Sequence, residues 1–180
     1  MQMQKNNKVD AEISLIKVPV NSKYEFELDQ ETDWVREFLL ELNENATEKS
    51  PKQYLEDTSI LITGTIEKKD KTDMGEFLLV TGIVQVDYVT ECVRTLKPMT
   101  IELDVPFKVC FIDEALAESE LFVDQDETYV EGEVYELYFF TKRIVNFRDM
   151  LHEQIFLNVD PYPILDAESK LDGVDSESHS

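Results

Sequence analysis

Residues 100–111 read TIELDVPFKVCF, and this stretch decides the fold. Apolar side chains occupy every odd position, and the even positions are polar except at Pro106 and Cys110. Because successive side chains of a strand point to opposite faces of a sheet, this alternation predicts a β-strand with one face buried and the other in water. Pro106 lies on the wet face and cannot donate a ladder hydrogen bond, so it indicates a sheet edge or a bulge.

The chain before this strand is also rich in strand patterns. Residues 58–67 and 76–92 are β-branched runs, and the polar residues 68–75 between them predict a hairpin loop. Gly64 and Gly82 lie inside the two runs, where glycine indicates a bulge or a close approach of backbones. Shorter strands are predicted at residues 12–20, 24–28 and 129–140.

Two segments change to the period of an α-helix. Apolar residues at helical spacing predict a helix over residues 32–43. A second apolar stripe predicts a helix over residues 146–159, with Asn146 as its N-cap and Asp149 as the capping-box partner. These patterns together predict an α+β fold, in which a mainly antiparallel, twisted sheet or a partly closed barrel carries two packed helices.

The length of 180 residues fits a single domain. We expect a frayed polar leader at residues 1–11, one domain at residues 12–165, and an acidic, disordered tail at residues 166–180. No apolar run is long enough to cross a membrane, and the polar leader lacks the apolar core of a signal peptide. We therefore expect a cytoplasmic protein without a membrane partner.

Charge is the most unusual bulk property of the chain. Seventeen Lys and Arg residues stand against thirty-nine Asp and Glu residues, which gives a formal net charge of −22. A field of this sign repels phosphate backbones and attracts basic partners, so free nucleic acid is a poor partner for the molecule as a whole. Simple solubility is the alternative explanation of the same charge.

Motifs for catalysis and for metal binding are incomplete. His152 and Glu153 begin like a zinc-protease helix, but Phe156 stands where the second His is required. The acidic run at residues 124–127 lacks the Gly and the final Glu of a calcium loop, and the five glycines form no phosphate-binding pattern. We therefore predict no catalytic residue, no metal site and no cofactor, and hence a protein that is not an enzyme.

Cys92 and Cys110 are the only cysteines. If residues 95–98 turn a hairpin, Cys92 lies opposite a residue near Ile101, about 30 Å along the strand from Cys110. A disulfide or a metal ion shared by the two cysteines is therefore not expected.

Basic residues form three islands in this acidic chain. Such islands are candidate contacts for phosphate, or they are salt-bridge partners for the surplus carboxylates. The islands are Arg94 with Lys97 beside the predicted turn, Lys142, Arg143 and Arg148 at the start of the second helix, and Lys68, Lys69 and Lys71 in the predicted hairpin loop.

Two segments carry a resemblance to a known family. Residues 80–84, VTGIV, lead into residues 91–98, ECVRTLKP, and residues 145–157 read VNFRDMLHEQIFL before the chain reaches Pro161. The first segment is similar to a glycine-containing strand that enters a Cys-x-Arg-Cys-Leu-x-Pro turn, and the second to an Ile-Asp-Leu helix start with a Glu-Gln continuation. Both patterns, in this order, resemble the YceD family of large ribosomal RNA accumulation proteins, loosely over residues 13–164.

The chain also departs from the family pattern. Thr95 stands at the second cysteine of the turn, and Asn146 stands at the Asp of the helix start, where it caps equally well. The acidic residues 165–180 replace the C-terminal cysteine cluster of the family. A metal role that such a cluster implies is therefore not carried over to this chain.

The resemblance implies a non-enzymatic factor that supports accumulation of large-subunit ribosomal RNA in the bacterial cytoplasm. The charge adds a basic ribosomal protein or the pre-ribosomal large subunit as partner, with rRNA contacted directly or indirectly. A direct RNA-binding module is the alternative, and an acidic interaction domain with an unrelated partner is a third. The candidate binding residues on the two motifs are Cys92, Arg94, Lys97, Arg148, Glu153 and Gln154.

Overall fold

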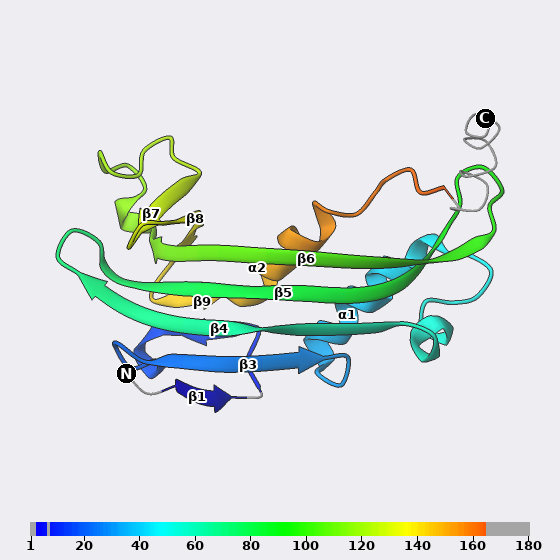
Figure 1. The fold of residues 1–180 in the computed structure, drawn as a ribbon, viewed down its shortest axis with the longest axis horizontal. Coiled ribbons are helices and arrows are strands. Elements are labelled where there is room, and N and C mark those ends of the chain that lie inside the picture. Colours follow the sequence, from blue (N-terminus) through cyan, green and yellow to red (C-terminus); the bar gives the residue numbers. More distant parts are fainter. Residues whose placement is uncertain (1–2, 7, 165–180) are drawn as a thin grey trace.

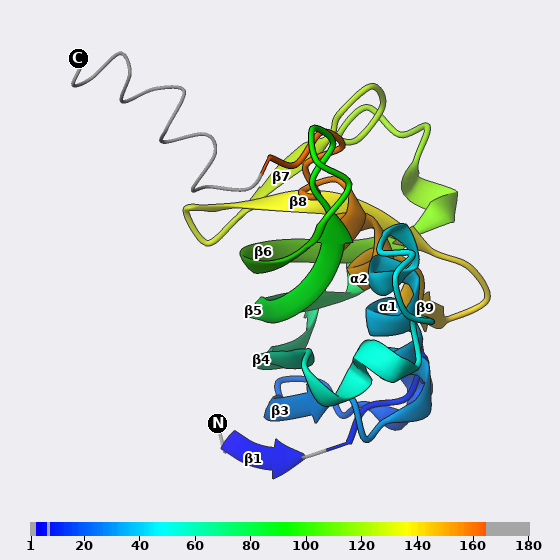
Figure 2. The ribbon, with the colours of Figure 1, turned by 90° about the vertical axis from the view of Figure 1, so that its right-hand side faces the viewer.

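The computed structural model describes residues 3–6 and 8–164, and these residues form an α+β fold, as the sequence predicts (Figure 1). Within them, a seven-stranded mixed sheet carries two α-helices on one face, and two short strands pair separately (Figure 2). The acidic tail predicted at residues 166–180 lies outside the described residues.

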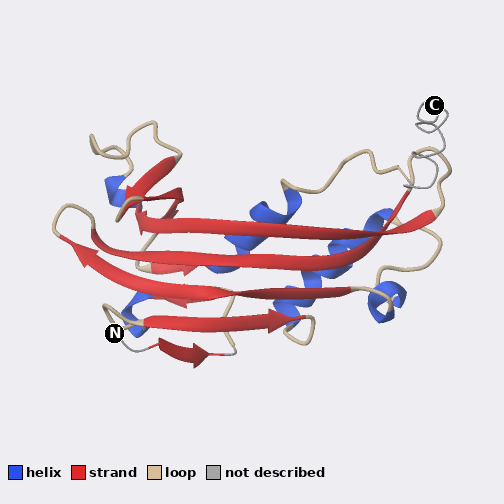
Figure 3. Ribbon diagram, viewed as in Figure 1, coloured by secondary structure: helices blue, strands red, loops and turns tan. Residues whose placement is uncertain are grey.

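The large sheet is open at both ends and mainly antiparallel (Figure 3). Its strands are β1 (Met3–Asn6), β3 (Lys23–Asp29), β4 (Ser59–Lys71), β5 (Gly75–Glu91), β6 (Pro98–Asp113), β7 (Glu127–Val130) and β8 (Glu133–Phe140), in the order β1-β3-β4-β5-β6-β8-β7. Only the pairs β1–β3 and β6–β8 are parallel among these described strands. The strands thus form the predicted sheet and not the partly closed barrel.

Two helices pack on the same face of this sheet (Figure 2). They are α1 (Asp33–Leu42) and α2 (Phe147–Phe156), which confirm the helices predicted at residues 32–43 and 146–159. The Asn146 side-chain oxygen accepts the backbone N–H of Asp149 at 3.0 Å, as expected of an N-cap. The chain reaches α2 through β9 (Ile144–Asn146), which pairs antiparallel with β2 (Glu12–Ser14).

The hairpin loop is shorter than the predicted residues 68–75, because β4 continues to Lys71. β4 and β5 stay paired as far as Lys71 and Gly75, so that only residues 72–74 form the turn. Lys68 is buried, with its Nζ 2.9 Å from the carbonyl oxygen of Leu15 and 3.3 Å from the carboxylate of Glu76. The carbonyl and the carboxylate compensate the burial of the Lys68 ammonium, so Lys68 can be part of β4 instead of a solvent-exposed loop.

Three shorter predictions also change. Residues 12–20 divide into β2 and a 3-10 helix at Leu15–Lys17. Residues 129–140 hold parts of two strands, because Glu131 and Gly132 adopt left-handed φ angles of 53° and 83° and turn the chain. Residues 3–6, assigned to the leader, form β1 on β3.

The alternation at residues 100–111 is confirmed in β6, but its second face is not wet throughout. Cys110 and Ile112 lie on that face and are buried with Phe77 and Phe122 in a cluster separate from the main core. The segment that follows β6 covers this end of the sheet, which the local pattern of β6 did not indicate. The expected separation of the cysteines holds, because Cys110 pairs with Leu79, far along β5 from Cys92, and the two cysteines form no disulfide.

Pro106 lies where β6 has no strand neighbour on one side, as the sequence indicates. β8 pairs with β6 only over the residues from Val109 to Asp113, and β5 borders the other side of β6. At Pro106 the strand is therefore an edge, where a missing N–H leaves no gap in a ladder.

A row of two glycines between two phenylalanines crosses the middle of the sheet. In this row Phe26 of β3 pairs with Gly64, Gly64 with Gly82, and Gly82 with Phe107 of β6. A Cβ atom on Gly82 would lie 2.3 Å from the carbonyl oxygen of Thr63 and 2.8 Å from the Phe107 ring. The close approach predicted from the glycines is therefore present, and neither position has room for a side chain.

The phenylalanines of this row connect the sheet to the helices. Phe26 meets Phe147, the first residue of α2, edge to face with ring centroids 5.4 Å apart. Trp34 of α1 packs on Phe147 at 6.0 Å and on Phe38 at 5.9 Å. These aromatic pairs belong to the main core, which lies between the sheet and both helices.

We expect Gly82→Ala to lower the free energy of unfolding by roughly 1–3 kcal/mol, because the added methyl group overlaps a carbonyl oxygen and an aromatic ring. Urea denaturation followed by circular dichroism measures the change. Thr81→Ala, at the exposed neighbouring position on the other face, is the matched control and should have a small effect. Equal stability of the Gly82 variant and the wild type would contradict the close approach.

Candidate functional site

The first motif forms the closed turn that joins β5 to β6, as the sequence predicts. The N–H of Cys92 donates to the carbonyl oxygen of Lys97 at 2.9 Å, and the N–H of Leu96 donates to that of Cys92 at 2.8 Å. Leu96 adopts a left-handed φ of 62°, which a branched side chain rarely takes. Residues 92–97 therefore hold a defined shape at one end of the sheet (Figure 1).

Four side chains of this turn reach the surface: Val93, Arg94, Leu96 and Lys97, which we call the turn surface. Leu96 is the most exposed of its apolar members, at 68%. The N–H of Val93 donates to the carbonyl oxygen of Pro163 at 2.9 Å, so the segment after α2 lies against the turn. The turn surface thus combines two basic side chains with apolar groups that the local backbone presents to solvent.

Cys92 is completely buried and contributes to the inside of the turn. Glu91 precedes it and accepts hydrogen bonds from the Thr47 side chain and, at 2.8 Å, from the Thr47 N–H. These bonds lower the pKa of Glu91, which keeps a negative charge beside the basic turn surface. The family motif therefore places a structural thiol and exposed basic side chains within one turn.

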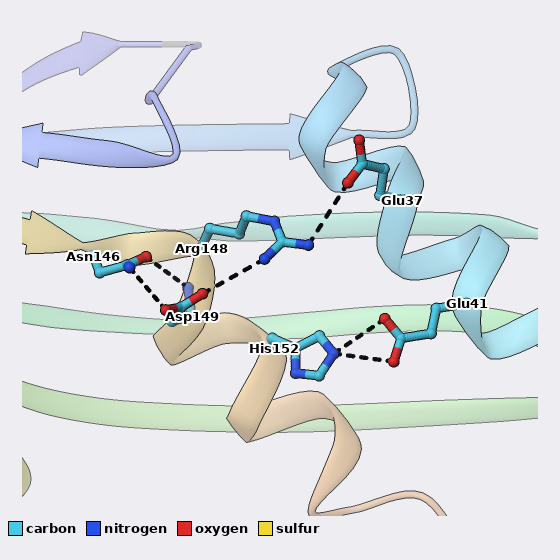
Figure 4. A network of polar contacts seen from close by, with 6 residues as sticks. All are labelled: Glu37, Glu41, Asn146, Arg148, Asp149 and His152. Atoms are coloured by element: carbon cyan, nitrogen blue, oxygen red, sulfur yellow. Dashed lines mark hydrogen bonds and ion pairs between the residues drawn. The ribbon is translucent and has the colours of Figure 1, made fainter.

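Arg148 lies at the start of α2 and joins the two helices (Figure 4). Its guanidinium is 3.6 Å from the Glu37 carboxylate of α1 and 3.5 Å from that of Asp149, and it lies over the Phe38 ring at 5.7 Å. Its side chain retains 34% exposure. Of the two interpretations of this basic residue, the geometry favours the salt-bridge partner.

His152 contacts α1 one turn further along α2 (Figure 4). Its Nε2 is 3.1 Å from both carboxylate oxygens of Glu41, and its ring stacks on Phe156 at 4.2 Å. The Glu41 contact was not predictable from local sequence, because 111 residues separate the two positions. His152 is half-buried between the helices.

Glu153 and Gln154 face β8 instead of α1. The buried Gln154 amide donates to the Glu136 carboxylate at 2.9 Å and to the Tyr138 hydroxyl at 3.1 Å, and that hydroxyl donates to Glu153. Burial, and then the hydrogen bond to Glu153, raises the pKa of Tyr138. The Glu-Gln pair of the second motif thus anchors α2 to the sheet.

The predicted binding residues are not brought together in one pocket. Cys92, Arg94 and Lys97 share the turn, Arg148 lies between α1 and α2, and Glu153 and Gln154 face β8. Of the other two basic islands, Arg143 pairs with Glu76, and Lys69 pairs with Glu67 and Glu131.

The described residues offer no group of three or more His, Cys, Asp and Glu side chains arranged to hold a metal ion. No described helix is long and apolar enough to cross a membrane. The geometry is that of a rigid scaffold whose β5–β6 turn exposes Arg94 and Lys97, on a chain of net charge −22.

Comparison with known families gives one match. The family model described as large ribosomal RNA subunit accumulation protein YceD matches residues 80–179, which is more than half of the chain. The match covers both segments that resemble the family in the sequence, at residues 80–98 and 145–161. No curated protein and no solved structure matches the chain.

We expect Gln154→Glu to destabilise the protein near about pH 7, because it places a carboxylate against Glu136 in a buried site. The introduced carboxyl has a raised pKa in the folded state, so the loss of stability should shrink as the pH falls toward about 4. Urea denaturation at both pH values measures it. Gln154→Met, of similar size, is the control without the added charge, and a pH-independent loss for Gln154→Glu would contradict the anchor geometry.

We expect neither cysteine of the native protein to react readily with a disulfide reagent such as DTNB near about pH 8. Both side chains are buried, and burial raises the pKa of Cys110 to about 12. In urea both thiols should react, and the single variants Cys92→Ser and Cys110→Ser assign each signal. Rapid modification of the folded protein would show that one of the sites opens.

Proposed function

Because the chain belongs to the YceD family of large ribosomal RNA subunit accumulation proteins, we propose that it acts in the cytoplasm as a non-enzymatic factor that holds a basic component of the large ribosomal subunit. The family supplies the process, in which large-subunit RNA accumulates. The charges of the chain indicate the class of partner. Protection of a ribosomal protein or of a pre-ribosomal particle would couple such binding to RNA accumulation.

The observation that carries the proposal is how the basic side chains are used. Six of the seventeen basic side chains pair with carboxylates of the fold, in a chain where thirty-nine acidic residues outnumber the basic ones. A protein gains affinity for nucleic acid chiefly by neutralising phosphates with Lys and Arg. Because six of these groups already neutralise carboxylates and the chain carries a net charge of −22, a basic polypeptide is the better electrostatic match. The held residues are Arg36, Lys68, Lys69, Lys108, Arg143 and Arg148.

Arg94 and Lys97 lie on an exposed, rigid turn. We propose that they orient the partner, while the long-range acidic field speeds the encounter. Arg148, Glu153 and Gln154 contribute by fixing α2 against α1 and β8. Direct contact of the turn with rRNA is the second candidate function, and the exposure of these two basic side chains is what favours it.

The first test is a pull-down of the tagged chain from native cells at low salt, with and without ribonuclease. We expect large-subunit ribosomal proteins to remain bound after ribonuclease treatment. Recovery of rRNA alone, lost together with everything else on ribonuclease treatment, would favour direct RNA contact. Enrichment of neither class would contradict the proposed function.

A charge reversal tests the turn. We expect Arg94→Glu combined with Lys97→Glu to impair complementation of a deletion strain while thermal unfolding stays close to wild type, because both side chains are exposed on the turn. Lys17→Glu combined with Lys52→Glu changes the net charge equally at exposed positions elsewhere and should complement. Full complementation by the turn variant would show that Arg94 and Lys97 do not orient the partner.

A further inference from the structure

One face of the sheet is left uncovered in its middle (Figure 1). The helices pack on the opposite face (Figure 2). Because side chains alternate along a strand, β3 to β6 present every second side chain to the uncovered side. Strand pairing arranges these side chains in rows. We call them the open face: Glu25, Thr65, Thr81 and Lys108 in one row, Glu27, Thr63, Ile83 and Pro106 in the next, then Asp29, Leu61, Gln85 and Asp104, and finally Ser59, Asp87 and Glu102.

The open face is bounded at both ends of the strands. At one end Phe77, Leu79 and Cys110 are buried beneath Phe122 and β7. At the other end Val89 is buried with Ala46 and Tyr54 from the segment between α1 and β4. Only the middle of this sheet face therefore meets solvent, because both ends of the face are covered.

Negative charge lies along the two sides of the open face. Glu25, Glu27 and Asp29 line it on β3, and Glu102 and Asp104 line it on β6; all five are exposed. Asp87 on β5 adds a sixth carboxylate, paired in register with Glu102. None of the six forms an ion pair that joins two described side chains. Lys108, the one basic side chain of these rows on β3 to β6, pairs with Glu133, and Lys5 of β1 stands in register with Glu25.

The centre of the open face holds two apolar side chains, Leu61 and Ile83, among polar ones that are mostly threonines. Ile83 of β5 pairs with Pro106 on one side and with Thr63 on the other, and Leu61 lies in the next row of β4. Leu61 and Ile83 are only partly buried, and Pro106 is exposed. Two apolar side chains set among threonines and flanked by carboxylates make the surface amphipathic, and such a surface also selects apolar groups.

The dimensions of the surface suggest the shape of its partner. The acidic sides on β3 and β6 are three strand spacings apart, or about 14 Å. An α-helix with its side chains is ~10–12 Å wide. A helix that lies along the strands can set an apolar face on Ile83 while lysine or arginine side chains on both flanks reach the carboxylates.

From this geometry we infer that the open face binds a lysine- and arginine-rich amphipathic helix of a partner protein. The inference rests on the proposed function for the identity of that partner as a ribosomal component, but the binding chemistry follows from the surface. RNA does not fit, because the same carboxylates would face its phosphates. The open face lies on β3 to β6, apart from the turn that joins β5 to β6, so it adds a binding surface to the orienting residues Arg94 and Lys97.

The test measures binding of a synthetic helical peptide with lysines on one face and leucines on the other to the purified full chain. Fluorescence anisotropy gives the affinity, and a peptide with alanine in place of leucine tests the role of Leu61 and Ile83. We expect Glu27→Lys, Glu102→Lys and Asp104→Lys together to weaken binding by at least about tenfold, because opposing charges become like charges. Ile83→Thr should remove most of the preference for the leucine peptide without a change in charge.

The matched control combines Glu44→Lys, Glu48→Lys and Glu118→Lys, which change the net charge equally at exposed positions outside the open face. We expect this control to weaken binding by no more than about threefold, through the general field alone. Equal losses in the two triple variants would overturn the inference, as would unchanged binding in the open-face variant. Tighter binding of a single-stranded RNA oligonucleotide than of the peptide would overturn it in favour of RNA.

The same variants separate this inference from the proposed function. If the wild-type chain recovers ribosomal proteins and the open-face variant recovers them equally well, the surface assignment fails and the proposed function stands. If the peptide binds the open face but the wild-type chain recovers no ribosomal protein, the surface stands and the proposed function fails. Circular dichroism of each variant establishes that the substituted proteins are folded.

Discussion

The close approach of β4 and β5 at Gly64 and Gly82 is the constraint on which the remaining structure depends. Without side chains at these two positions, the rings of Phe26 and Phe107 lie close above the backbone of the sheet. Phe26 then meets Phe147, and this contact places the start of α2 over the row. A side chain at either glycine would displace a ring and with it the helix, because a close-packed interior cannot absorb an added methyl group locally.

From that starting point α2 becomes the element that joins three parts of the molecule. Arg148 and His152 contact Glu37 and Glu41 on α1, while Gln154 contacts Glu136 on β8. The spacing of these residues along one helix means that opposite sides of α2 are fixed at the same time. The residues of the second motif thus hold α2 in place within the fold. The first motif, in contrast, exposes side chains to solvent.

The sequence predicted what depends on local pattern. Neighbouring residues alone indicate the strand alternation in β6, the helical spacing in α1 and α2, and the Asn146 cap. They also indicate the close approach of backbones at Gly64 and Gly82, and the structure confirms each of these predictions. Contacts between distant segments were not predictable in this way. The pairing of His152 with Glu41 and the burial of Lys68 against Leu15 are contacts of this kind.

The net charge also follows from the sequence alone, whereas the arrangement of the charges depends on the fold. Composition gives a net charge of −22, which implies a long-range field but no site. The fold then uses basic side chains such as Lys108 and Arg143 to hold carboxylates, and it covers both ends of one sheet face. Six of the thirty-nine acidic residues thereby flank Leu61 and Ile83 on that face. A field that only attracts basic partners cannot orient them, whereas an amphipathic surface together with a rigid basic turn can.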